Sequence, residues 1–330
     1  MTIPSWITTV CSLTTGALFL VLAWEVAKIL SATLPQFPRT LHIGQRTTHR
    51  PNNRATIPKI LWTYWHQAPT PEFISQCHAN WQRFAPDHEL RVVSQNNLSQ
   101  WLDTGMLTKL FDQLPPYRQA DWLRLKLLAH HGGIWIDAST LLSQNLEWVH
   151  TLQAEHNSEY VGFYIDRFTT RPEQPIVENW FMAAIPNSPF ILVLANEFDK
   201  AIQISEDTYL RELHRNGTQS TVVQGLSTND QLYLIMHVAA AVVLNRSEAS
   251  YQLSLIRAED SALGFHAALG WKKRHLYARL ALTPCPKLLP FIIKLRGGDR
   301  RVIEQGLSRG WIYKNSALAL LLNHSKHPVQ

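Results

Sequence analysis

The chain has 330 residues, of which 45% are hydrophobic and 17% charged, and this composition excludes a disordered protein. Its three cysteines, Cys11, Cys77 and Cys285, are odd in number and far apart, so neither a disulfide framework nor a paired-cysteine zinc site can be recognised. The formal net charge is +6, but residues 271–301 hold nine basic residues and one acidic residue. Basic charge confined to one segment argues against a nucleic-acid-binding protein and for a patch that faces phosphate or anionic lipid.

The amino terminus predicts a transmembrane helix. Residues 6–24 carry no charge, and as a helix they would be about 28 Å long, which matches the hydrocarbon core of a bilayer. A cleaved signal peptide is the alternative, but it needs a basic start, and the first basic residue, Lys28, follows the apolar run. Four arginines lie between residues 39 and 54. The positive-inside rule therefore predicts a single-pass membrane protein whose body lies on the cytoplasmic side.

The remaining chain predicts a linker and one globular domain. Residues 1–30 are expected to form the anchor. Residues 31–56 contain several prolines and polar side chains and are expected to form a linker. Residues 57–330 are expected to form the domain. From Ile57 onward, strand-like and helix-like segments alternate, as in an α/β architecture. We expect strands at residues 60–65, 89–94, 134–136, 160–165 and 177–184. Helices are expected from about residue 70, near residue 96, and over residues 117–131, 188–204 and 229–245.

The helix predicted over residues 117–131 is apolar nearly all round, which is typical of a buried helix. Arg118, Asp121 and Arg124 lie three residues apart and share one side of it. Because buried charges need partners, they form either an internal ion-pair ladder or a site for a charged ligand. Asp137 favours the ligand, since it directly follows a short apolar strand, and ligands of open α/β sheets gather at the carboxyl ends of strands. A cap for the turn before Ser139 is the alternative role for Asp137.

The string Arg118-Gln-Ala-Asp121-Trp-Leu-Arg124, followed by Gly132-Gly-Ile-Trp-Ile-Asp137-Ala-Ser139-Thr, resembles the core of glycosyltransferases of the capsular polysaccharide synthesis type. Residues 57–65 resemble the first strand of that family, and a looser similarity extends to about Arg301. The resemblance implies a GT-A fold, which is a Rossmann-like mixed sheet flanked by helices. It also implies an enzyme that moves a sugar from a nucleotide-sugar donor to a glycan or lipid-linked acceptor and retains the anomeric configuration.

The resemblance assigns roles to particular residues. Asp137 matches the first aspartate of the family's motif for metal and sugar nucleotide, and Ser139 stands at the position of the second aspartate. With Asp121 and Arg124, Asp137 is predicted to be catalytic. The residues expected to bind the donor are Trp62, Tyr64, Trp65, Arg118, Asp121, Arg124, Asp137 and Ser139. For the three aromatic residues, core packing of a central strand is the alternative.

A divalent cation, Mn²⁺ or Mg²⁺, is expected at Asp137, with Ser139 in the second ligand position and His266 as a further ligand. A hydroxyl binds metal far more weakly than a carboxylate, so the serine is the main departure from the family's pattern. Loss of a nucleoside diphosphate develops negative charge, which a cation and guanidinium groups would stabilise. The sequence identifies no general base; Glu178, Asp166 and Asp230 are the acids to examine.

Two alternatives stay open. Residues 271–301 interleave basic and apolar side chains, which predicts either a solvated face or a surface for a membrane or a lipid-linked pyrophosphate. The chain as a whole could be a non-catalytic member of the same fold that binds a nucleotide sugar or glycan without transferring it. A hydrolase or a dehydrogenase is disfavoured, because neither a G-x-S-x-G elbow nor a G-x-G-x-x-G turn after a strand is present.

Overall fold

The computed structural model describes residues 5–44, 55–103, 105, 110–218, 225–246 and 251–322. They divide into two compact units. The smaller unit comprises Met1–Leu34, Gly264–Leu289 and Leu295–Gln330, and the larger unit comprises Pro35–Leu263 and Pro290–Lys294. The sequence predicted one domain over residues 57–330, whereas most of the carboxyl-terminal part here belongs to the smaller unit.

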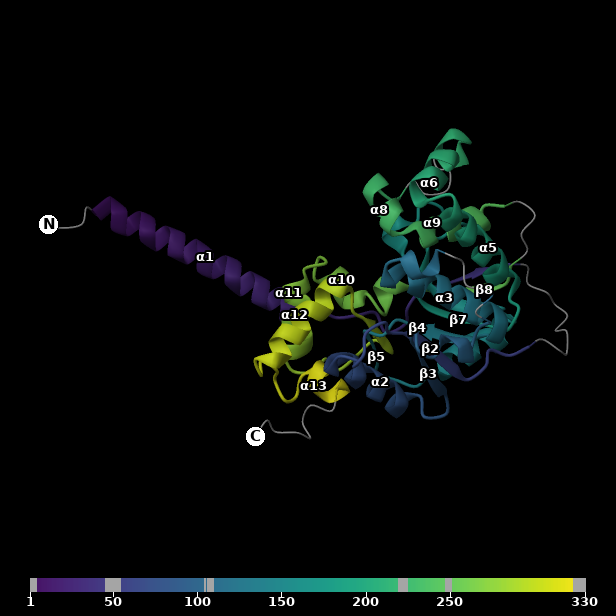
Figure 1. Cartoon of the computed structure of the whole chain (residues 1–330). Coiled ribbons are helices and arrows are strands. Elements are labelled where there is room, and N and C mark those ends of the chain that lie inside the picture. The colour runs from purple at the N-terminus through teal and green to yellow at the C-terminus, as the bar shows by residue number, and fades with distance from the viewer. Residues whose placement is uncertain are drawn as a thin grey trace. The chain divides into compact units, whose positions relative to one another are not determined.

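A mixed seven-stranded sheet forms the centre of the larger unit (Figure 1). Strands β2 and β4 pair in parallel, as do β2 and β3, and β6 and β8, whereas β1 and β7 run antiparallel to their neighbours. Most strands therefore point the same way. The order across the sheet is β1 (Thr40–Ile43), β8 (Leu253–Arg257), β6 (Tyr160–Tyr164), β7 (Val177–Ala184), β4 (Gly133–Ile136), β2 (Ile60–Tyr64) and β3 (Glu89–Val93).

Strand β1 lies inside the segment that the sequence predicted to be a linker. Its four residues pair antiparallel with β8, so residues 31–56 contribute an edge strand to the sheet. The side chains of β1 alternate between exposed and partly buried. A four-residue edge strand with half of its side chains in water lacks the continuous apolar run that marks a central strand. Residues 45–54 of the predicted linker lie outside the described residues.

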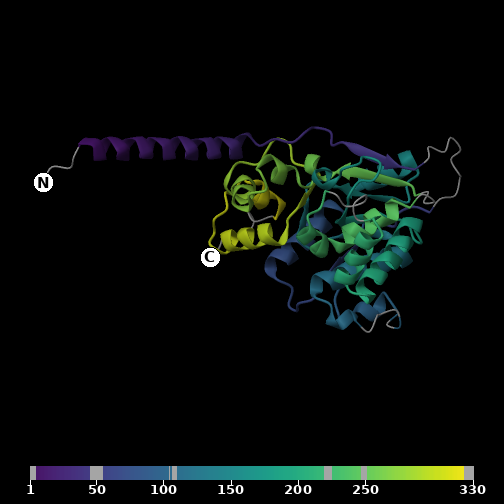
Figure 2. The same ribbon diagram turned by 90° about the horizontal axis from the view of Figure 1, so that it is seen from above.

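Helices cover the sheet (Figure 2). Helix α5 packs between α3 and α9, and these helices contact β2, β4 and β7, while α4 packs against β6 and β8. Helix α3 ends at Gly132, whose φ of 63° and whose closeness to Pro186 exclude a side chain there. The helices of this unit include α2 (Glu72–Phe84), α3 (Pro116–His131), α4 (Glu147–His156), α5 (Pro189–Gln203), α6 (Glu206–Arg215), α8 (Thr228–Tyr233) and α9 (Ile235–Leu244).

The predicted strands are confirmed within a residue or so, and two predicted helices differ from the structure. The helix expected over residues 229–245 is interrupted at Leu234, whose ψ of 32° is not helical, and forms α8 and α9. The helix expected near residue 96 is only a 3-10 turn, Leu98–Gln100. The side chain of Asn97 bonds the backbone of Ser94 and Val92 there, and such local bonds compete with helix formation.

A short second sheet in the larger unit consists of β5 (Thr140–Leu142) and β9 (Ile292–Lys294), which pair antiparallel. Thr140 lies opposite Lys294, so the turn after β4 lies beside the end of β9. Asn80 of α2 donates to the carbonyl of Leu142 at 2.9 Å and accepts from its N–H at 2.7 Å. Nearby, the indole of Trp81 donates to the carbonyl of Thr140 at 2.8 Å. Helix α2 thereby satisfies backbone groups of β5.

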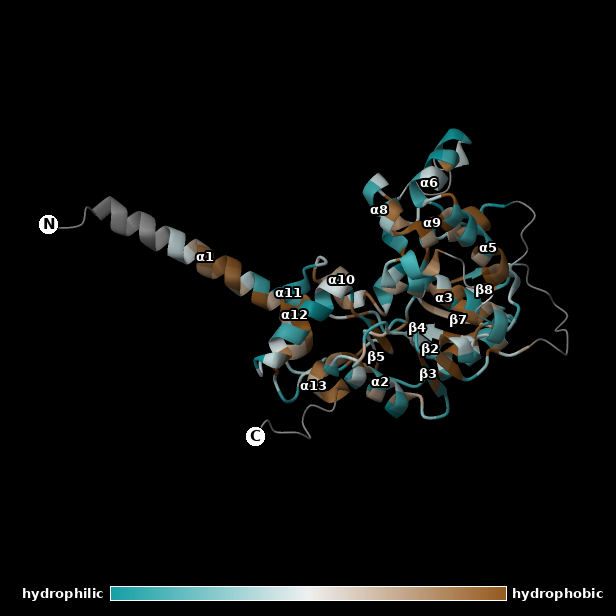
Figure 3. Ribbon diagram, in the orientation of Figure 1, coloured by the Kyte–Doolittle hydropathy of each residue, from teal (hydrophilic) through white to brown (hydrophobic). Residues whose placement is uncertain are grey.

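The smaller unit holds α1 (Ser5–Ser31), α10 (Gly264–Ala268), α11 (Lys273–Tyr277), the π-helix η6 (Ala278–Leu282), α12 (Gly297–Ser308) and α13 (Ala317–Leu321). Helix α1 is long and apolar, as the hydropathy colours of Figure 3 show for its described side chains. Its window Thr14–Ser31 has the length and composition of a membrane span, a test that a signal sequence also passes. The basic segment is not one continuous helix, because it forms α11, η6, β9 and the start of α12.

Asn80 provides a test of how α2 supports β5. Replacing it by Ala leaves a buried N–H and a buried C=O of Leu142 without partners. Each such group costs about 1–3 kcal/mol, so we expect Asn80→Ala to lower the free energy of unfolding by about 2–4 kcal/mol. Thermal unfolding followed by tryptophan fluorescence measures the change. Gln76→Ala, at a partly exposed position of the same helix, is the matched control, and equal melting temperatures for the two variants would refute the assignment.

Candidate active site at the carboxyl end of strand β4

Helix α3 carries the charged residues predicted from the sequence on one side, and the structure pairs them. Asp121 accepts from Arg118 Nη1 at 2.9 Å, and its other oxygen lies 3.2 Å from Arg124 Nη2. All three side chains are buried. The ion-pair ladder that the spacing allowed is therefore present, and it extends beyond the helix.

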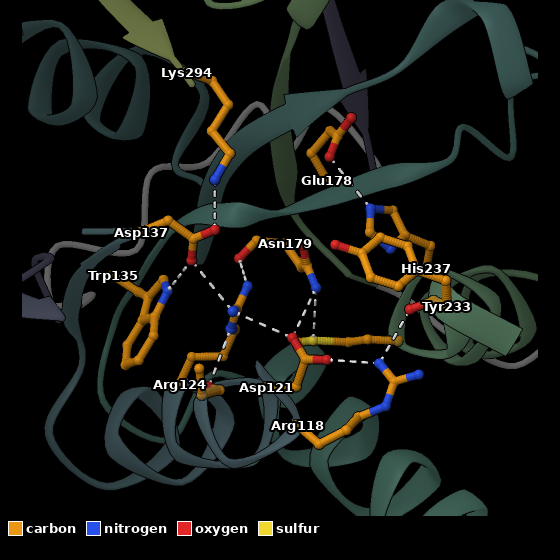
Figure 4. A network of polar contacts seen from close by, with 12 residues as sticks. Arg118, Asp121, Arg124, Trp135, Asp137, Glu178, Asn179, Tyr233, His237 and Lys294 are labelled. Atoms are coloured by element: carbon orange, nitrogen blue, oxygen red, sulfur yellow. Dashed lines mark hydrogen bonds and ion pairs between the residues drawn. The ribbon is translucent and has the colours of Figure 1, made fainter. Parts of the chain in front are cut away.

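Asp137 follows β4 directly, and its backbone N–H donates to the carbonyl of Trp180 on β7 at 2.9 Å. Figure 4 shows how its carboxylate is held. Oδ1 lies 3.2 Å from Arg124 Nη2 and accepts from the indole of Trp135 at 3.1 Å. Oδ2 lies 2.5 Å from Lys294 Nζ. The side chain of Asp137 is 28% exposed, against 4% for Arg124 and 11% for Lys294, so the carboxylate is the most accessible of the three groups.

The contacts join into a chain of alternating charge. Each neighbouring pair lies within ion-pair distance. In order, the members are Lys294, Asp137, Arg124, Asp121, Arg118 and Glu206. Because the members alternate in sign, each buried charge has a partner of opposite charge. This chain of six residues is called the ion chain below.

Strand β7 supplies polar groups beside the ion chain. Asn179 Nδ2 donates to Asp121 Oδ1 at 3.0 Å, and its carbonyl accepts from Arg124 Nη1. Its neighbour Glu178 lies 3.2 Å from Nε2 of His237 on α9. Figure 4 shows this second pair next to Asn179.

Arg118 uses its guanidinium for contacts within the protein. Nε bonds Glu206 of α6 at 2.5 Å, while Nη2 and Nη1 donate to the carbonyls of Leu232 and Tyr233 at 2.5 and 3.1 Å. Those carbonyls lie at the end of α8, where they have no partner in the next helical turn. Arg118 thus caps α8 and accounts for the break before α9.

Electrostatics favour the charged forms of Asp137 and Arg118. Burial opposes ionisation of Asp137, but the charges of Lys294 and Arg124 outweigh it and hold the pKa of this carboxyl below its usual value. Burial likewise opposes the charge of Arg118, but Glu206 and Asp121 outweigh it and hold the pKa of Arg118 above its usual value. Asp137 and Arg118 are therefore both charged at neutral pH.

The aromatic residues predicted to bind the donor do not share one environment. Trp62 has no exposed surface, and its indole donates to the carbonyl of Gly132 at 2.9 Å. Tyr64 is also buried, and its hydroxyl donates to Gln119 Oε1 at 2.6 Å. The core-packing alternative describes both residues. Trp65 is partly exposed, so it is the member of the trio that keeps a face toward solvent.

The predicted metal ligands are Asp137, Ser139 and His266. Ser139 lies in the turn between β4 and β5, two residues after Asp137. His266 belongs to the smaller unit, where its Nε2 lies 2.9 Å from Asp299 Oδ2 and both side chains are buried. Among the residues that the structure describes, no group of three or more His, Cys, Asp or Glu side chains could hold a metal ion. Shared coordination by Asp137 and His266 stays a prediction.

Of the acids to examine, Glu178 lies beside the ion chain and pairs with His237, while the other two have partners elsewhere. Asp166 pairs with Arg257 at 2.6 Å. Asp230 lies in the first turn of α8, where it bonds the hydroxyl of the capping residue Ser227 at 2.7 Å. The helix-cap alternative therefore describes Asp230.

Sequence reasoning did not single out Lys294, Asn179 or Trp135 as site residues. Lys294 is separated from Asp137 by 157 positions, so no local spacing connects them. Asn179 follows Glu178 in a strand with no residue pattern that marks a polar site. Trp135 lies between isoleucines in a buried strand, which is typical of a core residue.

Residues 29–206 match the model of a family described as capsular polysaccharide synthesis protein. The match covers more than half of the chain, so the chain belongs to this family. The matched part contains α3, Asp137 and Asn179, and it ends before α8 and β9.

Curated relatives with sequence similarity are named as glycosyltransferases. The chain is 31% identical over 153 residues to the O-glycosyltransferase braB of Annulohypoxylon truncatum. This alignment covers 41% of the present chain and 36% of the relative. It is 28% identical over 141 residues to the glycosyltransferase afumC of Aspergillus fumigatus, and this alignment covers 38% of the present chain and 35% of the relative. The chain thus spans about a third of the length of these relatives.

Two solved structures are also similar in part. The PaToxG glycosyltransferase matches 76% of this chain and 94% of its own with 15% identity and a TM-score of 0.32. The UDP-bound glycosyltransferase domain from the YGT toxin matches 84% and 95% with 10% identity and a TM-score of 0.38. TM-scores this low do not establish a common fold.

Arg118 provides a test of the cap on α8. Arg118→Lys keeps the charge but loses the planar fork that reaches Glu206 and two carbonyls. We expect a loss of about 2–3 kcal/mol in the free energy of unfolding and faster proteolysis near Tyr233, because each unsatisfied buried group costs about 1–3 kcal/mol. Limited proteolysis with mass spectrometry, together with thermal unfolding, measures both effects. Arg215→Lys on the exposed surface of α6 is the control, and matching behaviour of the two variants would argue against the cap.

Proposed function

We propose that the chain is a glycosyltransferase that uses a nucleotide-sugar donor and a hydroxyl acceptor. The observation that carries the proposal is the position of Asp137, which lies at the carboxyl end of β4 between Lys294 and Arg124. Ligands of α/β sheets gather at such ends, and two cations there suit a diphosphate. Membership of the capsular polysaccharide synthesis family and the names of the relatives support the same activity.

The proposed reaction uses these residues as follows. The bond between the anomeric carbon and a diphosphate oxygen breaks, and both electrons go to that oxygen. The acceptor oxygen forms the new bond on the face of the carbon that the diphosphate leaves, so the anomeric configuration is unchanged. The proton of the acceptor passes to the released diphosphate. Lys294 and Arg124 stabilise the charge that develops on the diphosphate. Asp137, the most exposed member of the set, contacts the donor, and Asp121 positions Arg124.

We also propose that the mixed sheet is of the GT-A type and that the acceptor is a glycan or a lipid-linked sugar. Two exposed tyrosines support an acceptor with flat apolar faces. Tyr117 and Tyr233 are both largely exposed, and their ring centroids lie 6.0 Å apart. Exposed tyrosines offer an apolar face and a polar tip to a ligand of this kind.

The activity is tested with the purified full chain and a panel of nucleotide sugars, with release of nucleoside diphosphate as the readout. We expect release with at least one donor and a loss of about 100-fold or more in Asp137→Asn, because one aligned charged group commonly contributes that much. Asp207→Asn, an exposed acid of α6, is the control and should retain the wild-type rate. Binding of a donor without turnover would support the non-catalytic alternative. Turnover that Asp137→Asn leaves intact would refute this site.

We propose further that α1 anchors the protein in a membrane with its body on the cytoplasmic side. Its apolar side chains, Leu20 and Leu22 among them, are exposed to solvent in the smaller unit. An exposed apolar surface of this extent is typical of a segment that contacts a membrane or another protein. The basic residues that follow α1 support the orientation.

Alkaline extraction of membranes tests the anchor. We expect the wild-type chain to stay in the membrane fraction and Leu20→Arg/Leu22→Arg to be released, since each central arginine costs about 2.5–3.5 kcal/mol of insertion. Leu192→Arg, on an exposed position of α5, is the control and should behave as wild type. Release of the wild-type chain, or an amino terminus shortened by cleavage, would contradict the anchor. Protease protection in sealed vesicles tests the orientation.

A further inference from the structure

The surroundings of Asp137 do not fit a divalent cation. Mg²⁺ and Mn²⁺ prefer several oxygen ligands. Asp137 offers one carboxylate, and both of its oxygens already accept from N–H donors of Lys294, Arg124 and Trp135. Within the described ranges no cluster of three or more metal-binding side chains occurs, and Ser139 replaces the second carboxylate of the family's motif.

The positive charges around Asp137 also disfavour a divalent cation. Its carboxylate is bonded by an ammonium at 2.5 Å and a guanidinium at 3.2 Å. A divalent cation on this carboxylate would lie close to the ammonium, and like charges at close range in a partly buried site repel strongly. A single carboxylate already shared by two cations gives little attraction to offset that repulsion.

Lys294 is held where a bound cation would be needed. It ends β9, opposite Thr140 of β5, and its backbone N–H donates to the carbonyl of Ala262 at 3.1 Å. Its ammonium lies 5.7 Å from the ring centroid of Trp180. Of its three N–H donors, one goes to Asp137, which leaves donors for a second anionic group. The position of the charge is set by strand pairing and not by a mobile loop.

We infer that Lys294, held by Asp137 and backed by Arg124, takes the place of the divalent cation and binds the diphosphate of the donor. This inference rests on the proposed function and deepens it, because it specifies a donor site that works without metal. Arg124, whose guanidinium lies over the ring of Trp135 at 5.0 Å, adds a second fixed positive charge behind the carboxylate. Asp137 bonds both cations and thereby orients them.

Binding of inorganic pyrophosphate in the presence of EDTA tests the inference directly. With the full chain in calorimetry, we expect saturable binding in EDTA that added Mn²⁺ does not tighten. Lys294→Met keeps the length of the side chain but removes the charge, and should weaken binding by at least about tenfold. Lys294→Arg should retain binding in EDTA. Lys200→Met, a half-exposed lysine of α5, is the matched control and should bind as wild type. Binding that requires Mn²⁺, or that Lys294→Met leaves unchanged, would overturn the inference.

Electron paramagnetic resonance of Mn²⁺ gives a readout that does not depend on activity. We expect no stoichiometric Mn²⁺ site in the wild-type chain. The double variant Ser139→Asp/Lys294→Met restores a carboxylate pair and removes the ammonium, so it should gain a Mn²⁺ site. A stoichiometric site in wild type that disappears in Asp137→Asn would show that the metal binds after all. If Lys294→Met fails to fold, the wild-type titration and Lys294→Arg still decide the question.

The outcomes separate this inference from the proposed function. Metal-independent binding of pyrophosphate through Lys294, without turnover of any nucleotide sugar, would support the cation role and contradict glycosyl transfer. Transfer that depends on Mn²⁺ would support glycosyl transfer and contradict the cation role.

Discussion

The two ion pairs of Asp137 hold together elements that are distant in the chain. The carboxylate follows β4, Arg124 comes from α3 and Lys294 from β9. Partly or wholly buried charges are costly without partners, so removing one of these groups takes a stabilising partner away from its neighbours. The pairs therefore fix the rotation of α3 against the sheet and the register of β9 beside β5. An apolar helix such as α3 could otherwise pack on the sheet with several faces.

Through Arg118, the ion pairs also hold the segment between α8 and α9. Because Asp121 is shared between Arg124 and Arg118, the ion chain continues from the sheet to the carbonyls at the end of α8. A continuous helix over residues 228–244 would use those carbonyls internally. By taking them, Arg118 allows the chain to turn at Leu234, next to the exposed Tyr233. The backbone around Tyr233 thus depends on a residue of the buried helix.

Local residue patterns predicted the central strands and α3, whereas distant pairings escaped prediction. Sequence patterns predicted the charged side of α3, with Arg118, Asp121 and Arg124, and the strand before Asp137. Both features involve residues that are close together in the sequence. Lys294 could not be found this way, because its closeness to Asp137 results from the pairing of β5 with β9. Strand β1 was missed because half of its side chains face water. Trp62 and Tyr64 have the composition of an aromatic binding face, and only their burial shows that they are core.

In the proposed function, the burial of Arg124 and Asp121 behind the more exposed Asp137 would place the charges of the site before a ligand binds. Arg124 and Asp121 are almost completely buried, while the carboxylate of Asp137 is 28% exposed. Groups fixed in the interior need no reorganisation when charge develops at the surface of the site, and preorganised charges stabilise a transition state more than mobile ones do. An ammonium on a paired strand satisfies this condition as a bound metal would, with its position encoded by backbone hydrogen bonds. A lysine on a loop would lose that advantage, so in the proposed reaction the short β5–β9 sheet would have a chemical role as well as a structural one.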